Sequence, residues 1–289
     1  MPASIMPIIF VFLWASAFIS AKAIMADGTA FASLALRFGI VGIGFLIATW
    51  LFARAKKMTS LQILHAAITG IFLHGFYLGG VFWALSHGMP ATISALIISL
   101  QPVFTALLAG PFLGERITIR QWGGIALGFI GTIIVIGFDF GNSIPLTGVL
   151  VCFLALAAAI SGTLYQKRFG QDLPLLPANM IQAFAAVALH LALLALFEVP
   201  AITFTNQFLI GMAWQVIAVS FGAYVMLLIL LARGTANQTS SLLFLIAPVA
   251  ALQGYIVLGE VVTSIDIIGL ALASCGVYIA TRQSPSPQS

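Results

Sequence analysis

The sequence contains the same unit twice. Residues 88–115 begin with glycine, carry Pro102 at their centre and end in Leu-Gly-Glu, and residues 234–260 repeat all three features around Pro248. The two prolines are 146 positions apart, and the two closing glutamates are 145 apart. A unit of about half the chain therefore occurs twice, so the fold has to be one that two copies can build. The register extends to Lys22 with Lys167, Gly124 with Gly269, and Gly131 with Gly276.

The composition places this repeat in a membrane. Hydrophobic residues make up 62% of the 289 residues, and charged residues only 6%. Soluble domains carry about 25% charged residues, so a soluble protein is excluded. The apolar stretches are continuous and do not alternate with polar residues, which indicates spanning helices and not the strands of a barrel. The net charge of +4 is spread over few residues, so its sum does not indicate a nucleic-acid partner.

Ten apolar segments are close to the length that crosses the hydrocarbon. Each half contains five, and an odd number of crossings places the second unit upside down relative to the first. We therefore expect an all-α membrane protein of two inverted five-helix repeats around a central cavity, residues 1–142 and 143–283, followed by a disordered polar tail at 284–289. The segments are residues 5–24, 32–52, 62–86, 91–112, 119–138, 146–166, 177–197, 208–232, 236–258 and 264–281.

The placement of basic residues predicts the orientation. With ten crossings, nine lysines and arginines fall on the side of the two termini, and Lys22 alone falls on the other. Basic residues concentrate on the cytoplasmic side of membrane proteins, so we expect both termini in the cytoplasm and the chain in a bacterial inner membrane. The nine are Arg54, Lys56, Lys57, Arg116, Arg120, Lys167, Arg168, Arg233 and Arg282.

These features together resemble a known superfamily. The sequence Phe-Leu-Trp-Ala-Ser at 12–16, Arg37-Phe38, the two proline segments with their Leu-Gly-Glu endings and the glycine-rich segments after them are similar to the drug/metabolite transporter superfamily, in its ten-helix EamA-like branch. The resemblance covers nearly the whole chain. It implies a cavity lined by helices 1, 3, 4, 6, 8 and 9, helices 5 and 10 packing the units together, and metabolite export with amino acids, aromatic ones included, prominent among the substrates.

His74 and Arg37 are the two candidate substrate contacts that could carry charge. His74 lies at the centre of the third segment, where a polar side chain faces the protein interior or water, and its counterpart Ser220 is also polar. His74 could bind substrate or bond to a neighbouring helix. Arg37 could hold a substrate carboxylate in its planar fork, pair with Asp27 or Glu260, or extend to the membrane interface. Its counterpart in the second half is Gln182.

Aromatic and amide side chains complete the predicted substrate site. Aromatic residues lining a cavity would give an apolar wall with polar tips, although those near helix ends could instead anchor the chain at the interface. Pro102 and Pro248 each remove a helix hydrogen bond, so they are candidate hinges for gating or static kinks. The remaining predicted substrate contacts are Trp14, Tyr77, Gln101, Tyr165 and Tyr224.

Two further motifs suggest structural roles. Glu115 and Glu260 each precede a segment that begins near threonine or serine, so we expect each to stabilise the N-terminus of the helix that follows it. The small residues of the fifth and tenth segments have the spacing that lets helices pack closely, either between the two repeats or at a dimer face.

The sequence shows no catalytic, metal or nucleotide motif, so we expect no enzyme, cofactor, metal or ATP drive. We predict a secondary transporter whose partners are a small-molecule substrate and the bilayer, acting as a monomer or weak homodimer. Aromatic or other bulky neutral amino acids come first as substrates, and cationic drugs or polyamines second. A channel or an intramembrane enzyme are the alternatives. All seven acidic residues fall at helix ends or in loops, which favours gradient-following transport without carboxylate-based proton exchange.

Overall fold

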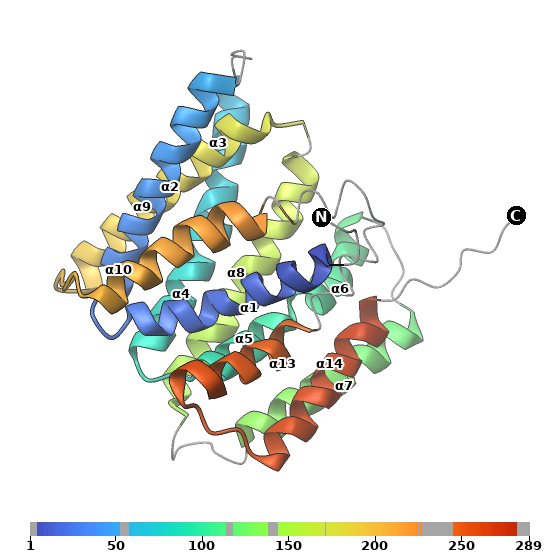
Figure 1. Cartoon of the computed structure of the whole chain (residues 1–289). Coiled ribbons are helices and arrows are strands. Elements are labelled where there is room, and N and C mark those ends of the chain that lie inside the picture. The colour runs from blue at the N-terminus through green and yellow to red at the C-terminus, as the bar shows by residue number, and fades with distance from the viewer. Residues whose placement is uncertain are drawn as a thin grey trace, which may run out of the picture. The chain divides into compact units, whose positions relative to one another are not determined.

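The fold is helical, as the sequence predicts. A computed structural model of the chain describes residues 5–52, 58–113, 118–137, 144–170, 172–224, 226 and 245–281 (Figure 1). Within these ranges the regular structure consists of helices, and Gly28 and Ile202 form an isolated antiparallel bridge. The helices are α1 (Met6–Ile24), α2 (Ala30–Phe52), α3 (Ser60–Gly70), η1 (Ile71–Phe76), α4 (Tyr77–Ser86), α5 (Ala91–Ser99), α6 (Gln101–Leu113), α7 (Ile119–Gly137), α8 (Leu146–Phe169), α9 (Leu175–Phe197), α10 (Asn206–Ala213), η2 (Trp214–Ala223), α13 (Ile246–Gln253), η3 (Gly254–Leu258) and α14 (Ser264–Thr281).

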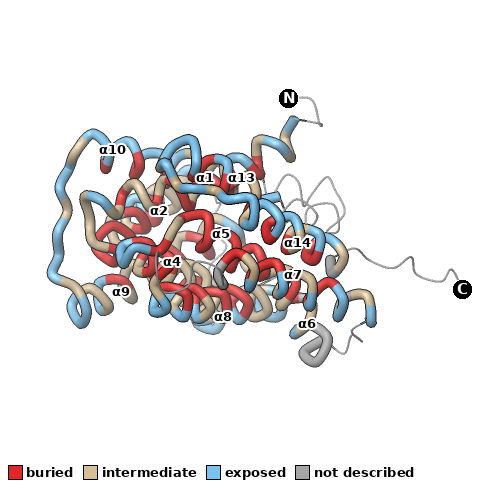
Figure 2. Tube along the Cα trace, turned by 90° about the horizontal axis from the view of Figure 1, so that it is seen from below, coloured by how far each residue is buried: buried red, intermediate tan, exposed pale blue. Residues whose placement is uncertain are grey.

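Among the described residues, five helical runs are long and apolar enough to cross a membrane, and shorter apolar helices lie at Ala91–Thr105, Trp122–Val135, Ile246–Leu258 and Ser264–Ile279. Many large apolar side chains are exposed on them, and Figure 2 shows exposed residues alternating with buried ones along the helices. Such a surface suits contact with lipid. The total of ten crossings and the inversion of the repeat stay predictions. The five runs are Met6–Ile24, Ala30–Phe52, Ser60–Ser86, Leu146–Phe169 and Leu175–Phe197.

The chain divides into two compact units, and each takes residues from both halves of the sequence. Unit 1 contains Met1–Ile19, Ala91–Ser143 and Phe221–Ser289, and unit 2 contains Ser20–Pro90 and Ile144–Ser220.

In unit 2, α9 packs along α2 on one side and along α3 and η1 on another (Figure 1). Glycines make the approach to α3 close. A Cβ atom on Gly70 would lie 2.5 Å from the Cα of Gln182, and one on Gly75 would lie 2.5 Å from the Cδ2 of Leu189. The contacts advance together along both helices, so the third segment and α9 run in the same direction.

In unit 1, α7 and α14 are in backbone contact along a pair of glycine faces (Figure 1). A Cβ atom on Gly131 would lie 2.5 Å from the carbonyl oxygen of Gly269, and one on Gly276 would lie 2.6 Å from that of Gly124. The helices are therefore antiparallel. The contacts are also reciprocal, because Gly269 is the repeat counterpart of Gly124 and Gly276 that of Gly131. The small residues of these segments thus pack the two copies of one helix against each other.

Three of the described helical segments contain π-helical turns that were not predicted from the sequence: η1, η2 and η3, the last of them at the end of the ninth segment. Residues 71–76 form η1 in the third segment, and residues 214–223 form η2 in the eighth. At the repeat offset of 146, residues 71–76 correspond to 217–222, so these two π-helical stretches coincide in the repeat. His74 and Ser220 occupy matching positions inside them. Single π-helical turns are rare and are often found at functional sites.

The second Leu-Gly-Glu motif ends one helix and caps another. Gly259 has a left-handed φ of 67°, and the amide of Glu260 donates to the carbonyl of Gly254 at 3.2 Å, which closes the helix C-terminus. The Glu260 carboxylate then accepts from the amides of Ala91 and Thr92 at 2.6 and 3.1 Å, and from the Thr92 hydroxyl at 2.5 Å. The expectation that Glu260 caps the helix following it is wrong, because it caps α5.

The N-terminus of α14 uses its own residues instead. Asp266 accepts hydrogen bonds from the amide and hydroxyl of Thr263, and the Thr263 hydroxyl accepts from the Asp266 amide. This reciprocal capping box leaves Glu260 available for the distant helix. Glu115 lies outside the described residues.

We expect Glu260→Gln to destabilise the protein by about 1–3 kcal/mol, because the amide keeps the size of the side chain but loses the charge and one acceptor at the α5 N-terminus. Unfolding of the purified protein in nanodiscs measures the change. Asp266→Asn is the matched control, since its bonds are exposed and local, and it should cost about 0.5–1 kcal/mol. Equal losses in the two variants would contradict the role given to Glu260.

Candidate functional site

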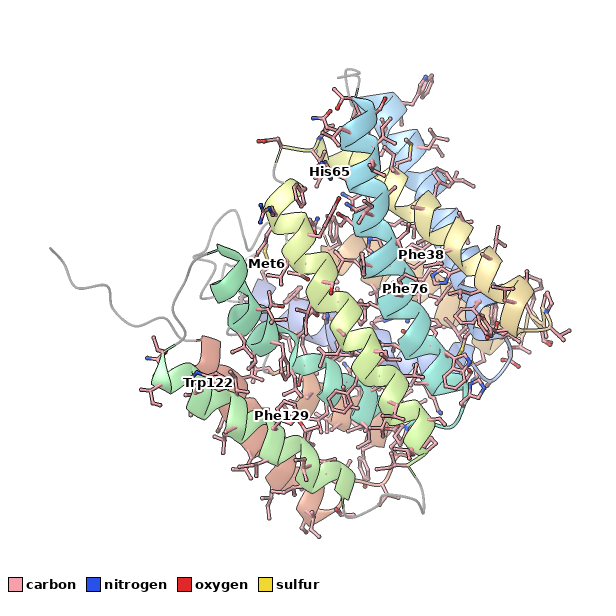
Figure 3. The ribbon with its side chains drawn as sticks, turned by 180° about the vertical axis from the view of Figure 1, so that it is seen from behind. Met6, Phe38, His65, Phe76, Trp122 and Phe129 are labelled. Carbon is pink, nitrogen blue, oxygen red and sulfur yellow. The ribbon has the colours of Figure 1, made fainter. Side chains whose placement is uncertain are left out.

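Unit 2 contains a set of polar side chains that lie on its apolar helices. We call this set the polar cluster: Arg37 of α2, His74 of η1, Gln182 and His190 of α9, and Ser220 of η2. Arg37, Gln182 and His190 are buried, with exposed fractions of 5%, 3% and 0%. Figure 3 labels Phe38, the neighbour of Arg37 on α2. Polar side chains at such positions need partners, and the partners define what the cluster can do.

Among the described residues, Arg37 has polar contacts but no acidic partner. Its Nε and Nη2 atoms donate to the Ser220 hydroxyl at 3.2 and 3.0 Å, and its guanidinium carbon lies 5.3 Å from the centre of the Phe38 ring. Among the described residues, no carboxylate is in ion-pair range. Asp27 accepts from the Thr205 hydroxyl at 2.6 Å, and Glu260 caps α5. These contacts give no support to pairing with Asp27, while the other roles considered for Arg37 stay predictions.

His74 lies between an amide and an aromatic ring. The side chain of Gln182 is within hydrogen-bonding range of its imidazole, and the Phe38 ring centre is 5.1 Å away. Gln182 lies on the neighbouring helix α9, so this contact is compatible with the interhelical partner considered from the sequence. The imidazole remains half-buried and not enclosed, so contact with a substrate stays a prediction.

Four members of the polar cluster form contacts crosswise between the two repeats. They are Arg37, His74, Gln182 and Ser220. Gln182 is the repeat counterpart of Arg37, and Ser220 is the counterpart of His74. Arg37 bonds to Ser220, and Gln182 is in range of His74. Two repeats related by a local twofold axis would give such crosswise contacts, as the predicted inverted repeat requires. The cluster therefore joins the two copies at one matched place, with a charge in only one of them.

His190 is a member of the cluster that lies on the seventh segment, outside the helices expected to line the cavity. Its Nε2 atom lies 3.1 Å from the carbonyl oxygen of His74. Its ring stacks near those of Phe31 and Phe38, with centres 6.2 and 6.0 Å away. No local motif marks this position, although its place in an apolar run made it unusual.

Tyr77 and Tyr165, both predicted substrate contacts, separate in unit 2. Tyr77 follows η1 directly, is half-buried and is close enough to Arg37 to interact with it electrostatically. Tyr165 bonds to His65 at 2.8 Å in the first part of α3, where Phe169 stacks on the His65 ring (Figure 3). The structure therefore associates Tyr77 with the polar cluster and gives Tyr165 a different partner.

The other predicted residues belong to unit 1. Trp14 packs against Phe10 with ring centres 5.3 Å apart, and Tyr224 is half-buried just after η2. Gln101 begins α6 after a break at Leu100. Their contact with a substrate stays a prediction.

Both predicted hinge prolines lie in the first turn of a helix. Pro102 is the second residue of α6, and Pro248 is the third residue of α13. Their missing N–H groups would have no intrahelical partner at these positions. The predicted 91–112 segment is accordingly two helices, α5 and α6, and bending at this break stays a prediction.

The described charges at helix ends have structural partners. Glu198 accepts from the amide of Phe31 at 2.9 Å and thereby caps α2. Lys22 donates to the carbonyls of Leu85 and Met89, both at 2.9 Å, at the end of α4. These bonds give a structural role to Lys22, the single lysine predicted on the less basic side of the membrane.

Among the described residues, no group of three metal-binding side chains occurs.

Comparisons with known proteins identify relatives over the whole chain. The model of the EamA-like transporter family matches it twice, over residues 1–137 and 146–282. A protein of Streptantibioticus cattleyicolor named "Probable terminal-alkyne amino-acid exporter" is 28% identical, with 96% of this chain and 92% of that protein covered. A Salmonella typhimurium protein named "Probable amino-acid metabolite efflux pump" is 27% identical, with 69% and 70% covered.

The fold also matches a solved structure. A crystal structure at 20% sequence identity aligns with a TM-score of 0.68 and covers 96% of both chains. An uncharacterized transporter of Archaeoglobus fulgidus is 26% identical over 93% of this chain and 95% of its own length.

Proposed function

The chain belongs to the EamA-like transporter family, and we propose that it exports small metabolites across the bacterial inner membrane by alternating access, with aromatic or other bulky neutral amino acids as its first substrates. The names of two relatives, an amino-acid exporter and an amino-acid metabolite efflux pump, support this substrate class. In this proposal both termini lie in the cytoplasm, and the two repeats cross the membrane in opposite orientations.

The observation that carries the proposal is the unneutralised Arg37. A buried cation is unfavourable unless a charge or several hydrogen bonds compensate it, and one serine hydroxyl compensates it here among the described residues. A substrate carboxylate would supply the missing charge through two parallel N–H···O bonds. Phe38 and Tyr77 beside it offer an apolar and aromatic surface for a bulky side chain.

The same charge disfavours the second class of substrates. Cationic drugs and polyamines would bring a positive group towards Arg37, and like charges at close range repel. The described acidic residues that could offset this lie at helix ends, where Glu198 and Glu260 already accept backbone hydrogen bonds. A carrier of polyamines would need a carboxylate within its pathway.

Counterflow in proteoliposomes tests the proposal. Vesicles loaded with unlabelled phenylalanine should take up external labelled phenylalanine faster than empty vesicles, because a carrier returns faster when loaded. A channel would show no such acceleration, and an enzyme would yield a new product. Absence of trans-acceleration across a panel of aromatic and aliphatic amino acids would contradict the proposal.

His74→Ala should slow this exchange by about 10-fold while leaving insertion intact, because it removes a hydrogen-bonding group that a substrate would use. Apparent affinity and membrane content are measured on the same preparations. His65→Ala is the control, since His65 bonds to Tyr165 and not to the polar cluster. Unchanged exchange and affinity in His74→Ala would leave His74 with a packing role only.

A further inference from the structure

The π-helical turn η1 determines where His74 lies. In an α-helix each amide bonds to the carbonyl four residues earlier, whereas the amide of Tyr77 bonds to the carbonyl of Phe72, five residues earlier. A wider turn disturbs the regular ladder of backbone bonds and depends on support from neighbouring groups. The direction of the His74 side chain therefore depends on what holds η1.

His190 supplies that support from α9. A carbonyl oxygen only accepts hydrogen bonds, so the His190 Nε2 atom, 3.1 Å from the His74 oxygen, carries the hydrogen. The Nδ1 atom is then an acceptor, and it is buried without a partner among the described residues. A leucine would fill similar space without that unpaired group, so packing alone does not account for a histidine here.

The same helix also holds the side chain of His74. Gln182 is within hydrogen-bonding range of the His74 imidazole, while His190 bonds to the His74 carbonyl. His190 packs against α4 as well, because a Cβ atom on Gly79 would lie in van der Waals contact with its ring at 3.4 Å. Helix α9 therefore contacts the backbone of His74 through His190 and approaches its side chain through Gln182.

This support exists in one repeat only. At the offset of 145 that relates Arg37 to Gln182, the counterpart of His190 is Phe45, whose side chain has no hydrogen-bond donor. The matched pairs of the cluster are reciprocal, but the bond to the His74 carbonyl is not.

We propose that His190 is a positioning residue of the transporter: by holding the carbonyl of His74 in η1, it sets the direction in which His74 meets the substrate. This rests on the proposed function, in which His74 contacts substrate. His190 itself is enclosed by Phe31, Phe38 and the backbone of η1, and it acts through His74.

Exchange kinetics in proteoliposomes test the positioning role. His190→Leu removes the donor at similar volume and should raise the apparent KM for phenylalanine by about 10-fold, with the maximal rate within about twofold of wild type. His190→Gln places an amide donor at similar reach and should return the KM to within about threefold. In a His74→Ala background, His190→Leu should add nothing, because the group that it positions is gone.

A spectroscopic measurement makes the test independent of transport. The chain has four histidines, so ¹⁵N-histidine NMR of the protein in nanodiscs resolves each by single substitution. Wild-type His190 should carry its hydrogen on Nε2, and His190→Leu should shift the His74 signals, which His190→Gln should restore.

Three outcomes would overturn the proposal. The first is a hydrogen on His190 Nδ1, and the second is a set of His74 NMR signals that His190→Leu does not shift. The third is a His74→Ala/His190→Leu double variant whose loss of transport equals the sum of the losses in the two single variants. If wild type shows no exchange of any amino acid, the proposed function fails, and the NMR result still decides whether His190 holds His74. If exchange is present and His190→Leu leaves the KM unchanged, the positioning role alone fails.

Discussion

Replacing Arg37 by glutamine should reduce the transport efficiency for aromatic amino acids by about 100-fold, the largest effect expected from a single change in the polar cluster. The carboxylate of the substrate would lose both its charge partner and a planar pair of donors. Glutamine is the suitable replacement because the repeat places Gln182 at the matching position, where it fits between the same kinds of helices. The variant should remain folded, since it removes a buried charge that has no acidic partner within the described part of the chain.

A pair of substrates isolates the contribution of the carboxylate. Wild type should prefer phenylalanine over phenethylamine, which has the same ring and amine but no carboxylate, and Arg37→Gln should abolish that preference. Arg37→Lys keeps the charge but not the planar fork, so it should retain an intermediate preference. Competition by both compounds against labelled phenylalanine gives the measurement. If Arg37→Gln slows both compounds equally, or neither, then Arg37 does not read the carboxylate.

The fold was predictable from the sequence because its main determinants are local. Continuous apolar runs predicted helices, and the helices α1, α7, α8, α9 and α14 lie within a few residues of the predicted segments. The break at Leu100 and the π-helical turns η1, η2 and η3 were not predicted. A π-helical turn leaves no strong signal in the local sequence, because groups outside the helix stabilise it. In η1 such a group is His190, which bonds to the carbonyl of His74.

The candidate site was only partly predictable, for a related reason. Repeat offsets matched Arg37 with Gln182 and His74 with Ser220, but each match was considered alone. A twofold relation brings each residue to the other's counterpart, so the crosswise pairs could have been predicted by combining the two offsets. Glu260 was assigned to the wrong helix because sequence neighbours were taken as spatial neighbours. The α5 N-terminus that Glu260 caps lies far away in the sequence, because the hydrogen bond to Ala91 spans 169 positions.

The glycine contacts between α7 and α14 are also reciprocal between the two repeats. They give the second prediction with a large expected effect. Gly131→Leu should prevent formation of a stable folded protein, with a loss above about 4 kcal/mol. Its Cβ atom would meet the backbone of Gly269 and Ala273, and backbone atoms in a packed helix pair cannot move aside as a flexible side chain can. Gly276→Leu should have the same effect, because its Cβ atom would meet the backbone of Gly124 and Gly128.

Gly123 provides the matched control on the same helix. A Cβ atom there would meet nothing within 4 Å, so Gly123→Leu should insert, fold and exchange substrate like wild type. Monodisperse yield after size exclusion and the unfolding temperature in nanodiscs compare the three variants. Since Gly131 and Gly276 are repeat counterparts, equal losses from the two substitutions are expected from a symmetric contact. A stable Gly131→Leu protein, or a large difference between the two, would show that this helix pair does not hold unit 1 together in the way its reciprocal glycine contacts indicate.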